Sequence, residues 1–299
     1  MKQILVSIII PTYNRADFIG KTIKSVLNQT YSNFEIIIVD DGSTDNTKEV
    51  VRSFADSRIS YFKKQNEERA VARNYGIEKA KGDFITFLDS DDVFLDFHLA
   101  EAVNFIKAHI NDLKIFFQPY YLLLEGQRKN KIPQKIIPIA KSLIKKGNFM
   151  ACQGVFLKNE VARNNSFNED RLLSGSEDYE LWLRISRKFK IEYNPVYSSI
   201  LIDHQGRSQH YEDNSLLILR KELFLKYTLA HGYSKPEFRV ISSGAYSYIA
   251  LHLSLQSDNT AWSWLLKAIG CDLRILFTKR TFVTIKNLFL AKSSVIKGA

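Results

Sequence analysis

Hydrophobic and polar positions in the first hundred residues follow two alternating patterns. Short, continuous runs rich in β-branched residues predict strands that are buried on both faces. Between these runs, apolar residues recur at a spacing near 3.6, which predicts helices. The predicted strands cover 6–10, 35–39, 59–62 and 83–88, and the predicted helices lie around 18–27, 44–54 and 70–80. This alternation predicts an α/β fold with a mixed, mainly parallel sheet that helices cover on both faces.

The pattern is less regular after residue 110. Strand is predicted within 114–124, where Pro119 indicates an edge or a break, and again within 148–157. The polar, proline-containing segment 127–138 predicts a loop, and 177–189 predicts a helix. From residue 214 onward every signal is helical, with predicted helices at 216–229, 240–255, 262–276 and 282–290.

Two acidic clusters directly follow predicted strands. Asp40 and Asp41 come after 35–39, and Asp89, Asp91 and Asp92 come after 83–88. Parallel strands place their carboxyl ends at one edge, where such sheets bind ligands, so we expect both clusters there. Close carboxylates repel one another unless a cation offsets their charge, and oxygen-only ligands suit Mg²⁺ or Mn²⁺. An Asp-rich turn alone is more often a solvated loop that caps a helix, but the second cluster at the same edge favours a metal site.

Two further pairs of charged residues carry candidate chemistry. Arg69 and Arg73 lie four residues apart at the start of a predicted helix, where their guanidinium groups could reach a diphosphate or a base. They could equally be solvated surface arginines. Glu177 and Asp178 begin another predicted helix, whose dipole stabilises an ionised carboxylate. Such a residue is either a helix cap or a general base.

Two histidines, His204 and His210, flank the segment Gly206-Arg-Ser208. Imidazole can ligate a metal or contact a phosphate. A single histidine is more often structural or exposed, and both interpretations stay open here.

Composition and charge narrow the class of protein. The 299 residues are 45% hydrophobic and 25% charged, typical of a globular protein. The two cysteines form no CxxC pair, which excludes a disulfide framework and favours a reducing compartment. The sequence predicts neither a secretory signal nor a membrane-spanning helix, and we expect a cytoplasmic protein. Residues 1–110 carry 14 basic and 16 acidic residues, whereas residues 111–299 carry 28 basic and 16 acidic residues.

Read together, these segments resemble the family 2 glycosyltransferases, inverting enzymes with the nucleotide-sugar-binding GT-A fold. The matching text is Ser7-Ile-Ile-Ile-Pro-Thr-Tyr-Asn-Arg15, Ile38-Val-Asp-Asp-Gly-Ser-Thr-Asp45, Ala72-Arg-Asn-Tyr-Gly76, Phe87-Leu-Asp-Ser-Asp-Asp92 and Glu177-Asp-Tyr-Glu-Leu-Trp-Leu-Arg184. The resemblance covers roughly 4–210. It implies a catalytic domain over 1–213, with a nucleotide-binding half at 1–110 and an acceptor half at 111–213, before a helical region at 214–299.

The resemblance also implies roles for individual residues. Pro11, Thr12 and Tyr13 would line the nucleobase pocket, Asp40 would bind the uracil edge, and Arg73 would lie near the base or the diphosphate. Asp89 and Ser90 would contact the donor, Asp91 and Asp89 would bind Mn²⁺ or Mg²⁺, and Asp92 would neighbour the metal. Asp178 would be the catalytic base. His204 would lie near the diphosphate or the metal, although Asp203 stands close to where the family usually has an arginine.

The expected reaction transfers a sugar from a nucleotide sugar, with UDP as the family-level expectation, to a saccharide or lipid-linked saccharide in polysaccharide or cell-envelope glycan synthesis. A nucleotidyltransferase is a rival, but 11–15 lacks the glycine that its phosphate loop would need. A catalytically silent binding protein is another. Nucleic-acid binding is not expected, because no nucleic-acid module is recognisable. Residues 259–299 hold seven basic residues and one acidic residue, with interspersed aromatics. They either contact a membrane surface peripherally or pack as a helical appendage.

Overall fold

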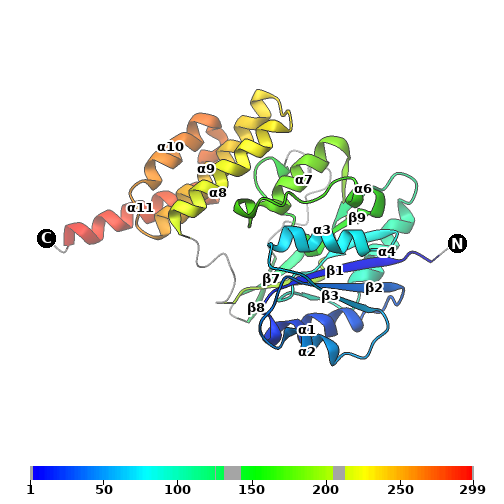
Figure 1. Ribbon diagram of the computed structural model, residues 1–299. Coiled ribbons are helices and arrows are strands. Elements are labelled where there is room, and N and C mark those ends of the chain that lie inside the picture. The colour runs from blue at the N-terminus through cyan, green and yellow to red at the C-terminus, as the bar shows by residue number, and fades with distance from the viewer. Residues whose placement is uncertain (1–2, 125, 131–142, 205–212, 298–299) are drawn as a thin grey trace. The chain divides into compact units, whose positions relative to one another are not determined.

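The computed structural model describes residues 3–124, 126–130, 143–204 and 213–297. The chain divides into two compact units. The first comprises residues 1–141 and 149–207 and contains both strands and helices, and we call it the α/β unit. The second comprises 142–148 and 208–299, and we call it the helical unit (Figure 1). Each unit is described separately below.

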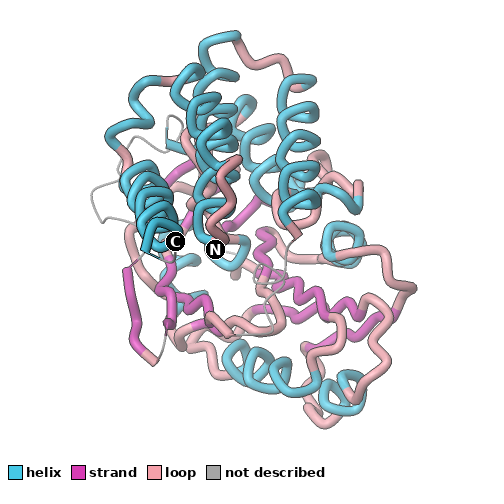
Figure 2. The backbone as a smooth tube through the Cα atoms, turned by 90° about the vertical axis from the view of Figure 1, so that its left-hand side faces the viewer, coloured by secondary structure: helices cyan, strands magenta, loops and turns pink. Residues whose placement is uncertain are grey.

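A seven-stranded sheet forms the centre of the α/β unit (Figure 2). Its strands are β1 (Val6–Thr12), β2 (Phe34–Asp40), β3 (Ile59–Lys63), β4 (Phe84–Phe87), β6 (Ile115–Phe117), β9 (Val155–Lys158) and β10 (Ile191–Tyr193). They are ordered β10-β6-β9-β4-β1-β2-β3. Strands β1 to β4 are parallel to one another, as are β6 and β10, while β9 is antiparallel to both of its neighbours. The predicted mixed, mainly parallel sheet is therefore confirmed.

Helices pack on both faces of this sheet, because successive side chains of a strand point to opposite faces. They are α1 (Ala16–Leu27), α2 (Thr47–Arg52), α3 (Arg69–Lys79), α4 (His98–Ala108), α6 (Asn159–Arg163) and α7 (Glu177–Lys188). Val6, Ile8 and Ile10 of β1 share one hydrophobic cluster with the apolar faces of α1, α2 and α4. Helix α3 lies on the other face (Figure 1), where a Cβ on Gly76 would overlap the side chain of Ile9. Glycine is thus required for this close approach.

A second, four-stranded sheet belongs to the same unit. It consists of β5 (Val93–Phe94), β7 (Tyr120–Leu124), β8 (Gln127–Asn130) and β11 (Ser199–Ile202), in the order β5-β11-β7-β8. Antiparallel pairing of β5 with β11 sets Val93 opposite Ile200. The residues that follow β11 therefore run back toward the residues that precede β5. This sheet, which the sequence patterns did not predict, brings His204 to the second acidic cluster.

The structure corrects three predicted boundaries. The predicted loop 127–138 begins with strand β8, and its residues 131–138 lie outside the described part of the chain. The strand predicted within 148–157 begins only at Val155, after a 3₁₀ turn at Cys152–Gly154. The helix predicted over 262–276 ends at Cys271 and is followed by a 3₁₀ turn at Leu273–Phe277. The predicted break at Pro119 is confirmed, since it separates β6 from β7.

The helical unit contains α8 (Asn214–Ala230), α9 (Lys235–Leu255), α10 (Ala261–Cys271) and α11 (Lys279–Lys297). Helix α9 contacts the other three, and its Ile249 and Leu253 form a hydrophobic core with Leu265 and Leu288. A capping box of Ser234 and Glu237 begins α9. Within the described residues, no helix is both long and apolar enough to span a membrane.

Candidate active site

The carboxyl ends of three parallel strands define one edge of the large sheet. Thr12 at the end of β1 pairs with Asp40 at the end of β2, and Ile9 pairs with Phe87 at the end of β4. The chain leaves β4 directly into Asp89. The prediction that both acidic clusters lie at this edge is therefore confirmed.

The second acidic cluster brings three carboxylates together. One oxygen from each of Asp89, Asp91 and Asp92 lies within 4.8 Å of the others. Asp92 is fully buried, and its Oδ1 accepts a hydrogen bond of 2.9 Å from the backbone N–H of Ile202 in β11. Carboxylate oxygens at this separation can share one small divalent cation. Their chemistry therefore fits a Mg²⁺ or Mn²⁺ ion.

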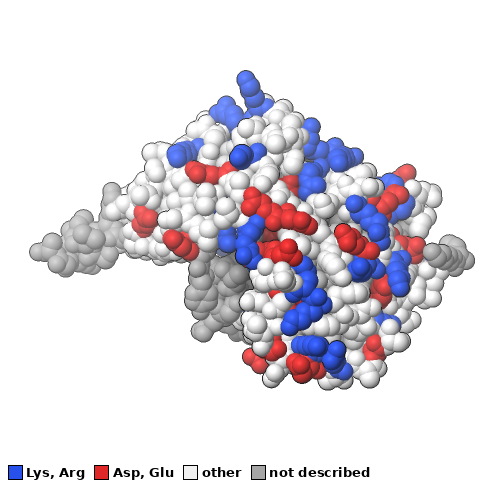
Figure 3. Space-filling view, in the orientation of Figure 1, with Lys and Arg blue, Asp and Glu red and all other residues white. Residues whose placement is uncertain are grey.

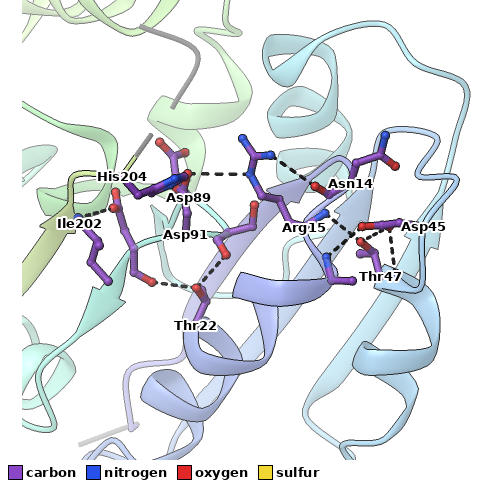
Figure 4. Close-up of polar contacts among 12 residues, drawn as sticks. Asn14, Arg15, Thr22, Asp45, Thr47, Asp89, Asp91, Ile202 and His204 are labelled. Atoms are coloured by element: carbon purple, nitrogen blue, oxygen red, sulfur yellow. Dashed lines mark hydrogen bonds and ion pairs between the residues drawn. The ribbon is translucent and has the colours of Figure 1, made fainter. Parts of the chain in front are cut away.

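Asp91 has two nitrogen-bearing neighbours (Figure 4). His204 Nε2 lies 3.0 Å from Asp91 Oδ2, and Arg15 Nε lies 3.8 Å from the same oxygen. The imidazole stacks on the ring of Phe18 in α1, with 4.6 Å between ring centroids. His204 thus contacts a candidate metal ligand, but the converging ligand atoms found in the described part of the chain are those of the three aspartates. His210 lies outside the described residues.

The first acidic cluster is satisfied by its own surroundings. Asp40 is fully buried, and its carboxylate accepts hydrogen bonds from the Ser43 N–H at 2.7 Å and from the Tyr61 hydroxyl. Burial, and then this bond to Asp40, raise the pKa of Tyr61. Asp41 accepts bonds from Lys64 Nζ and from the backbone N–H groups of residues 67 and 68. The contact of Asp40 with a uracil edge stays a prediction, and these bonds also fix the loop after β2.

The segment after β1 is tied to the loop after β2 (Figure 4). Asn14 adopts a left-handed conformation with φ 49°, its N–H donates to Ser43 Oγ, and its Oδ1 accepts from the N–H of Thr44. Thr12 is buried, and its Oγ1 has no hydrogen-bond partner among the described residues. Tyr13 is 45% exposed. The edge therefore offers a free buried hydroxyl and an exposed aromatic ring.

Two other residues that are predicted to bind the nucleotide-sugar donor also lie at this edge, but both are buried. Pro11 is buried within β1. Ser90 is buried between the aspartates, and its carbonyl accepts a hydrogen bond of 2.9 Å from Thr22 Oγ1 of α1. That bond anchors the acidic turn to the helix that follows β1.

A buried arginine joins the acidic turn to helix α7. The Arg73 guanidinium is 2% exposed and donates to Asp89 Oδ1 and to Glu177 Oε1, each at 2.8 Å. It also lies 5.3 Å from the ring centroid of Phe167. With both ends of the guanidinium engaged by carboxylates, its placement favours positioning Asp89 over direct contact with a donor.

Glu177 and Asp178 differ sharply in their surroundings. Glu177 is buried beside Arg73, and its Oε2 accepts from the Gly175 N–H at 2.6 Å. Burial alone would raise the pKa of Glu177, but the positive charges of Arg69 and Arg73 outweigh it and lower that pKa. Asp178 is half-buried at the first turn of α7. Glu177 is thus the fixed member of the pair, and Asp178 is the more accessible one.

Cys152 is a site residue that sequence reasoning missed. Burial raises the pKa of its thiol well above the ordinary value, and the charges of Asp178, Asp89 and Glu177 add to this, against the opposing effect of Arg73. The thiol therefore lies within electrostatic range of both the acidic turn and the start of α7. Nothing in the sequence around Cys152 signals this, because only the fold brings its 3₁₀ turn to the site.

The sequence profile described as "Glycosyl transferase family 2" matches residues 7–165. The chain belongs to this family. The UDP-Glc:alpha-D-GlcNAc-diphosphoundecaprenol beta-1,3-glucosyltransferase WfaP of Escherichia coli is 37% identical to it over 187 residues, which is 62% of this chain and 71% of that protein. This family 2 chain spans only 28% to 46% of the length of the first three curated relatives that it matches.

Solved structures share the fold at low sequence identity. Staphylococcus aureus TarS 1–349 in complex with UDP-GlcNAc superposes with a TM-score of 0.66 at 18% identity, covering 98% of this chain and 92% of that one. The mannosyltransferase PcManGT from Pyrobaculum calidifontis, in complex with GDP-Man and Mn²⁺, gives a TM-score of 0.61 at 19% identity, covering 97% and 86%. The chain therefore has the GT-A fold that the sequence predicts.

Proposed function

We propose that this chain transfers a sugar from a nucleotide sugar, preferentially a UDP-sugar, to a hydroxyl group of a saccharide carried on a lipid. Family membership supports glycosyl transfer in general. The observation that carries the proposal is the convergence of Asp89, Asp91 and Asp92 at the carboxyl edge of the sheet, connected through Arg73 to the helix that bears Asp178.

The three aspartates would hold a divalent ion, Mn²⁺ or Mg²⁺, with Asp91 and Asp89 as the main ligands. When bound, such an ion supplies positive charge that offsets the charge growing on the departing nucleoside diphosphate. The chain's own contribution is to fix the ligands: Arg73 holds Asp89, while His204 and Arg15 flank Asp91. The Mn²⁺ in PcManGT supports this proposal.

The nucleobase of the donor would lie at the carboxyl ends of β1 and β2. The exposed ring of Tyr13 can stack on a nucleobase, and the buried hydroxyl of Thr12 can hydrogen-bond to it. Asn14 would keep the two loops in register, since its hydrogen bonds join it to residues 43 and 44, and Asp40 would fix the second loop through the N–H of Ser43. The UDP-GlcNAc in TarS supports a uridine donor.

Asp178 would act as the general base. Its carboxylate would accept the proton of the acceptor hydroxyl as that oxygen attacks the anomeric carbon, while the bond to the diphosphate breaks from the opposite face. The product would have the inverted anomeric configuration. Glu177, locked to Arg73, would hold the start of α7 so that Asp178 faces the reacting carbon. The acceptor named for WfaP, a sugar on diphosphoundecaprenol, supports a lipid-linked acceptor in cell-envelope glycan synthesis.

A two-stage experiment tests this function. Thermal shifts with a panel of UDP- and GDP-sugars, with and without Mn²⁺, identify the donor, and we expect stabilisation by one UDP-sugar only when the metal is present. That donor is then incubated with a GlcNAc-diphosphate-lipid analogue, and NMR of the product reports the anomeric configuration. Stabilisation without transfer to any acceptor would support a silent binding protein, whereas a retained configuration would contradict Asp178 as an inverting base.

A further inference from the structure

The end of the helical unit exposes large apolar side chains in an unusual concentration. Phe277 is 92% exposed, Phe282 70%, Leu273 67% and Phe289 61%. Apolar side chains exposed singly are ordinary on a protein surface, but a concentration of them marks an interaction site. These four come from one stretch of chain, the 3₁₀ turn at Leu273–Phe277 and helix α11.

Helix α11 separates this exposed face cleanly from a buried one. Thr281, Thr284 and Leu288 are fully buried. Phe282 and Phe289 are exposed, together with Lys279 and Lys286. Positions 279, 282, 286 and 289 are three or four residues apart and therefore share one side of the helix. We call Leu273, Phe277, Lys279, Phe282, Lys286 and Phe289 the apolar–basic surface.

Basic residues predominate in the part of the sequence that carries this surface. Residues 259–299 contain seven basic residues and one acidic residue, Asp272. The Asp272 carboxylate is paired with Arg274 Nε at 2.8 Å, so its charge is offset locally. Figure 3 shows basic and acidic side chains interspersed on the face of the α/β unit, and both kinds also occur on the visible face of the helical unit. Exposed aromatic rings that alternate with lysines are complementary to a partner whose surface is negatively charged and whose interior is apolar.

We propose that the apolar–basic surface docks on an anionic lipid bilayer, with α11 lying along the interface and Phe277, Phe282 and Phe289 inserted below the headgroups. Lysine side chains can extend to headgroup phosphates while their aliphatic stems cover apolar surface. A second copy of the chain fits the surface less well, because self-association would bring the lysines of both copies together. The proposal goes beyond sugar transfer and would place the enzyme beside lipid-linked acceptors.

Flotation of the full chain with vesicles tests the docking. One vesicle is phosphatidylcholine alone, and the other contains about one-third phosphatidylglycerol. We expect binding to the anionic vesicles at low salt, with strong weakening at high salt. Lys279→Gln/Lys286→Gln should lower the partition coefficient about 30-fold, since each lysine near an anionic surface contributes roughly five-fold. Phe277→Ser/Phe282→Ser should lower the partition coefficient more than about ten-fold, because two rings that would be inserted into the bilayer are lost.

Matched variants in the same unit serve as controls. Leu229 and Leu255 are 55% and 63% exposed, and Lys226 and Lys235 are exposed outside the apolar–basic surface. Leu229→Ser/Leu255→Ser and Lys226→Gln/Lys235→Gln should bind anionic vesicles like the unchanged chain. Equal loss in these controls, or equal binding to both vesicle types, would overturn the proposal. The proposal would also be overturned if the unchanged chain bound no vesicles and sedimented as a dimer that Phe277→Ser/Phe282→Ser converts to a monomer.

Docking and sugar transfer fail separately in this design. The Phe277→Ser/Phe282→Ser variant should transfer sugar to a water-soluble acceptor analogue at the unchanged rate, since both rings are exposed and lie outside the candidate active site. Vesicle binding without any transfer would leave the docking intact and contradict the proposed function. Sugar transfer without vesicle binding would support the proposed function and contradict the docking.

Discussion

Two acidic clusters at the same sheet edge look alike in the sequence and differ in the structure. Asp40 and Asp41 receive hydrogen bonds from a tyrosine, a lysine and three backbone N–H groups. The cluster of Asp89, Asp91 and Asp92 also receives donors, but one oxygen of each of its three carboxylates lies within 4.8 Å of the other two. The first cluster is therefore part of the fold's internal support, and the second is the one whose charge calls for a cation.

The comparison indicates that the convergence of carboxylate oxygens, and not the number of aspartates, separates a structural acidic turn from a candidate metal site. Buried carboxylates are tolerated when hydrogen bonds or opposite charges offset their desolvation. Around Asp40 the chain provides those donors itself. Around Asp91 it provides an imidazole and an arginine, both near the same oxygen, Oδ2.

The largest expected effect concerns Asp178, the proposed general base. Asp178→Asn should reduce kcat by about 10²–10⁴-fold, because a positioned general base contributes that much. The Kd of the donor should hardly change, since the amide keeps the shape of the side chain. Rapid-quench turnover together with calorimetric donor binding measures both. Asp112→Asn, an exposed aspartate after α4, should leave both unchanged, and near-normal turnover of Asp178→Asn would remove the base assignment.

The next effect concerns the link between the second cluster and α7. Arg73→Met removes a guanidinium that pairs with two carboxylates, one of them fully buried, and should lower the unfolding free energy by about 3–5 kcal/mol in urea titrations. Arg73→Met/Glu177→Gln should recover part of that loss. Arg58→Met breaks a surface pair with Asp56 and should cost about 1 kcal/mol or less. Similar losses at the two arginines would contradict the positioning role.

A smaller effect separates the two clusters directly. Asp40→Asn replaces an acceptor by an amide whose N–H groups face existing donors, and it should cost about 1–3 kcal/mol of unfolding free energy. Asp91→Asn should have little effect on the unfolding free energy, or raise it, because it relieves repulsion among three carboxylates. Thermal and urea unfolding of both variants gives the comparison. Equal losses would mean that both clusters support the fold in the same way.

The last prediction concerns a pH dependence of the unfolding free energy that arises at the buried His98. Burial lowers the pKa of His98 to about 3, and its Nδ1 lies 2.8 Å from Ser198 Oγ. The folded chain keeps this imidazole neutral, while the unfolded chain protonates it below about pH 6.5. Its contribution is therefore complete above that pH and is lost as the pH falls toward 3, by about 1.4 kcal/mol per unit.

The variant His98→Gln isolates this contribution, because carboxylate effects cancel in the difference from the unchanged chain. Unfolding free energies between pH 6.5 and 5 should fall less steeply for His98→Gln. His109→Gln, which alters an exposed histidine, should keep the original slope. Identical slopes for all three proteins would show that His98 is protonated in the folded state.

The sequence predicted the sheet edge well because short, continuous apolar runs mark β1, β2 and β4, and parallel pairing then aligns their ends. It could not distinguish Asp40 from Asp91, since the hydroxyl that satisfies Asp40 comes from Tyr61 on a neighbouring strand. The bond of Arg73 to Glu177 joins residues 104 positions apart and follows from tertiary packing alone. Strands as short as β5 and β11 give no periodic signal, so the sheet that brings His204 to Asp91 was missed.

Calorimetric titration of the donor UDP-sugar with and without Mn²⁺, on the unchanged chain and on Asp91→Asn and Asp40→Asn, tests the central claim most directly. The account predicts that Mn²⁺ tightens donor binding to the unchanged chain and to folded Asp40→Asn, whereas the Mn²⁺ effect falls at least about ten-fold in Asp91→Asn. A Mn²⁺ effect that survives in Asp91→Asn and disappears in Asp40→Asn would contradict it, because the metal would then belong to the other cluster.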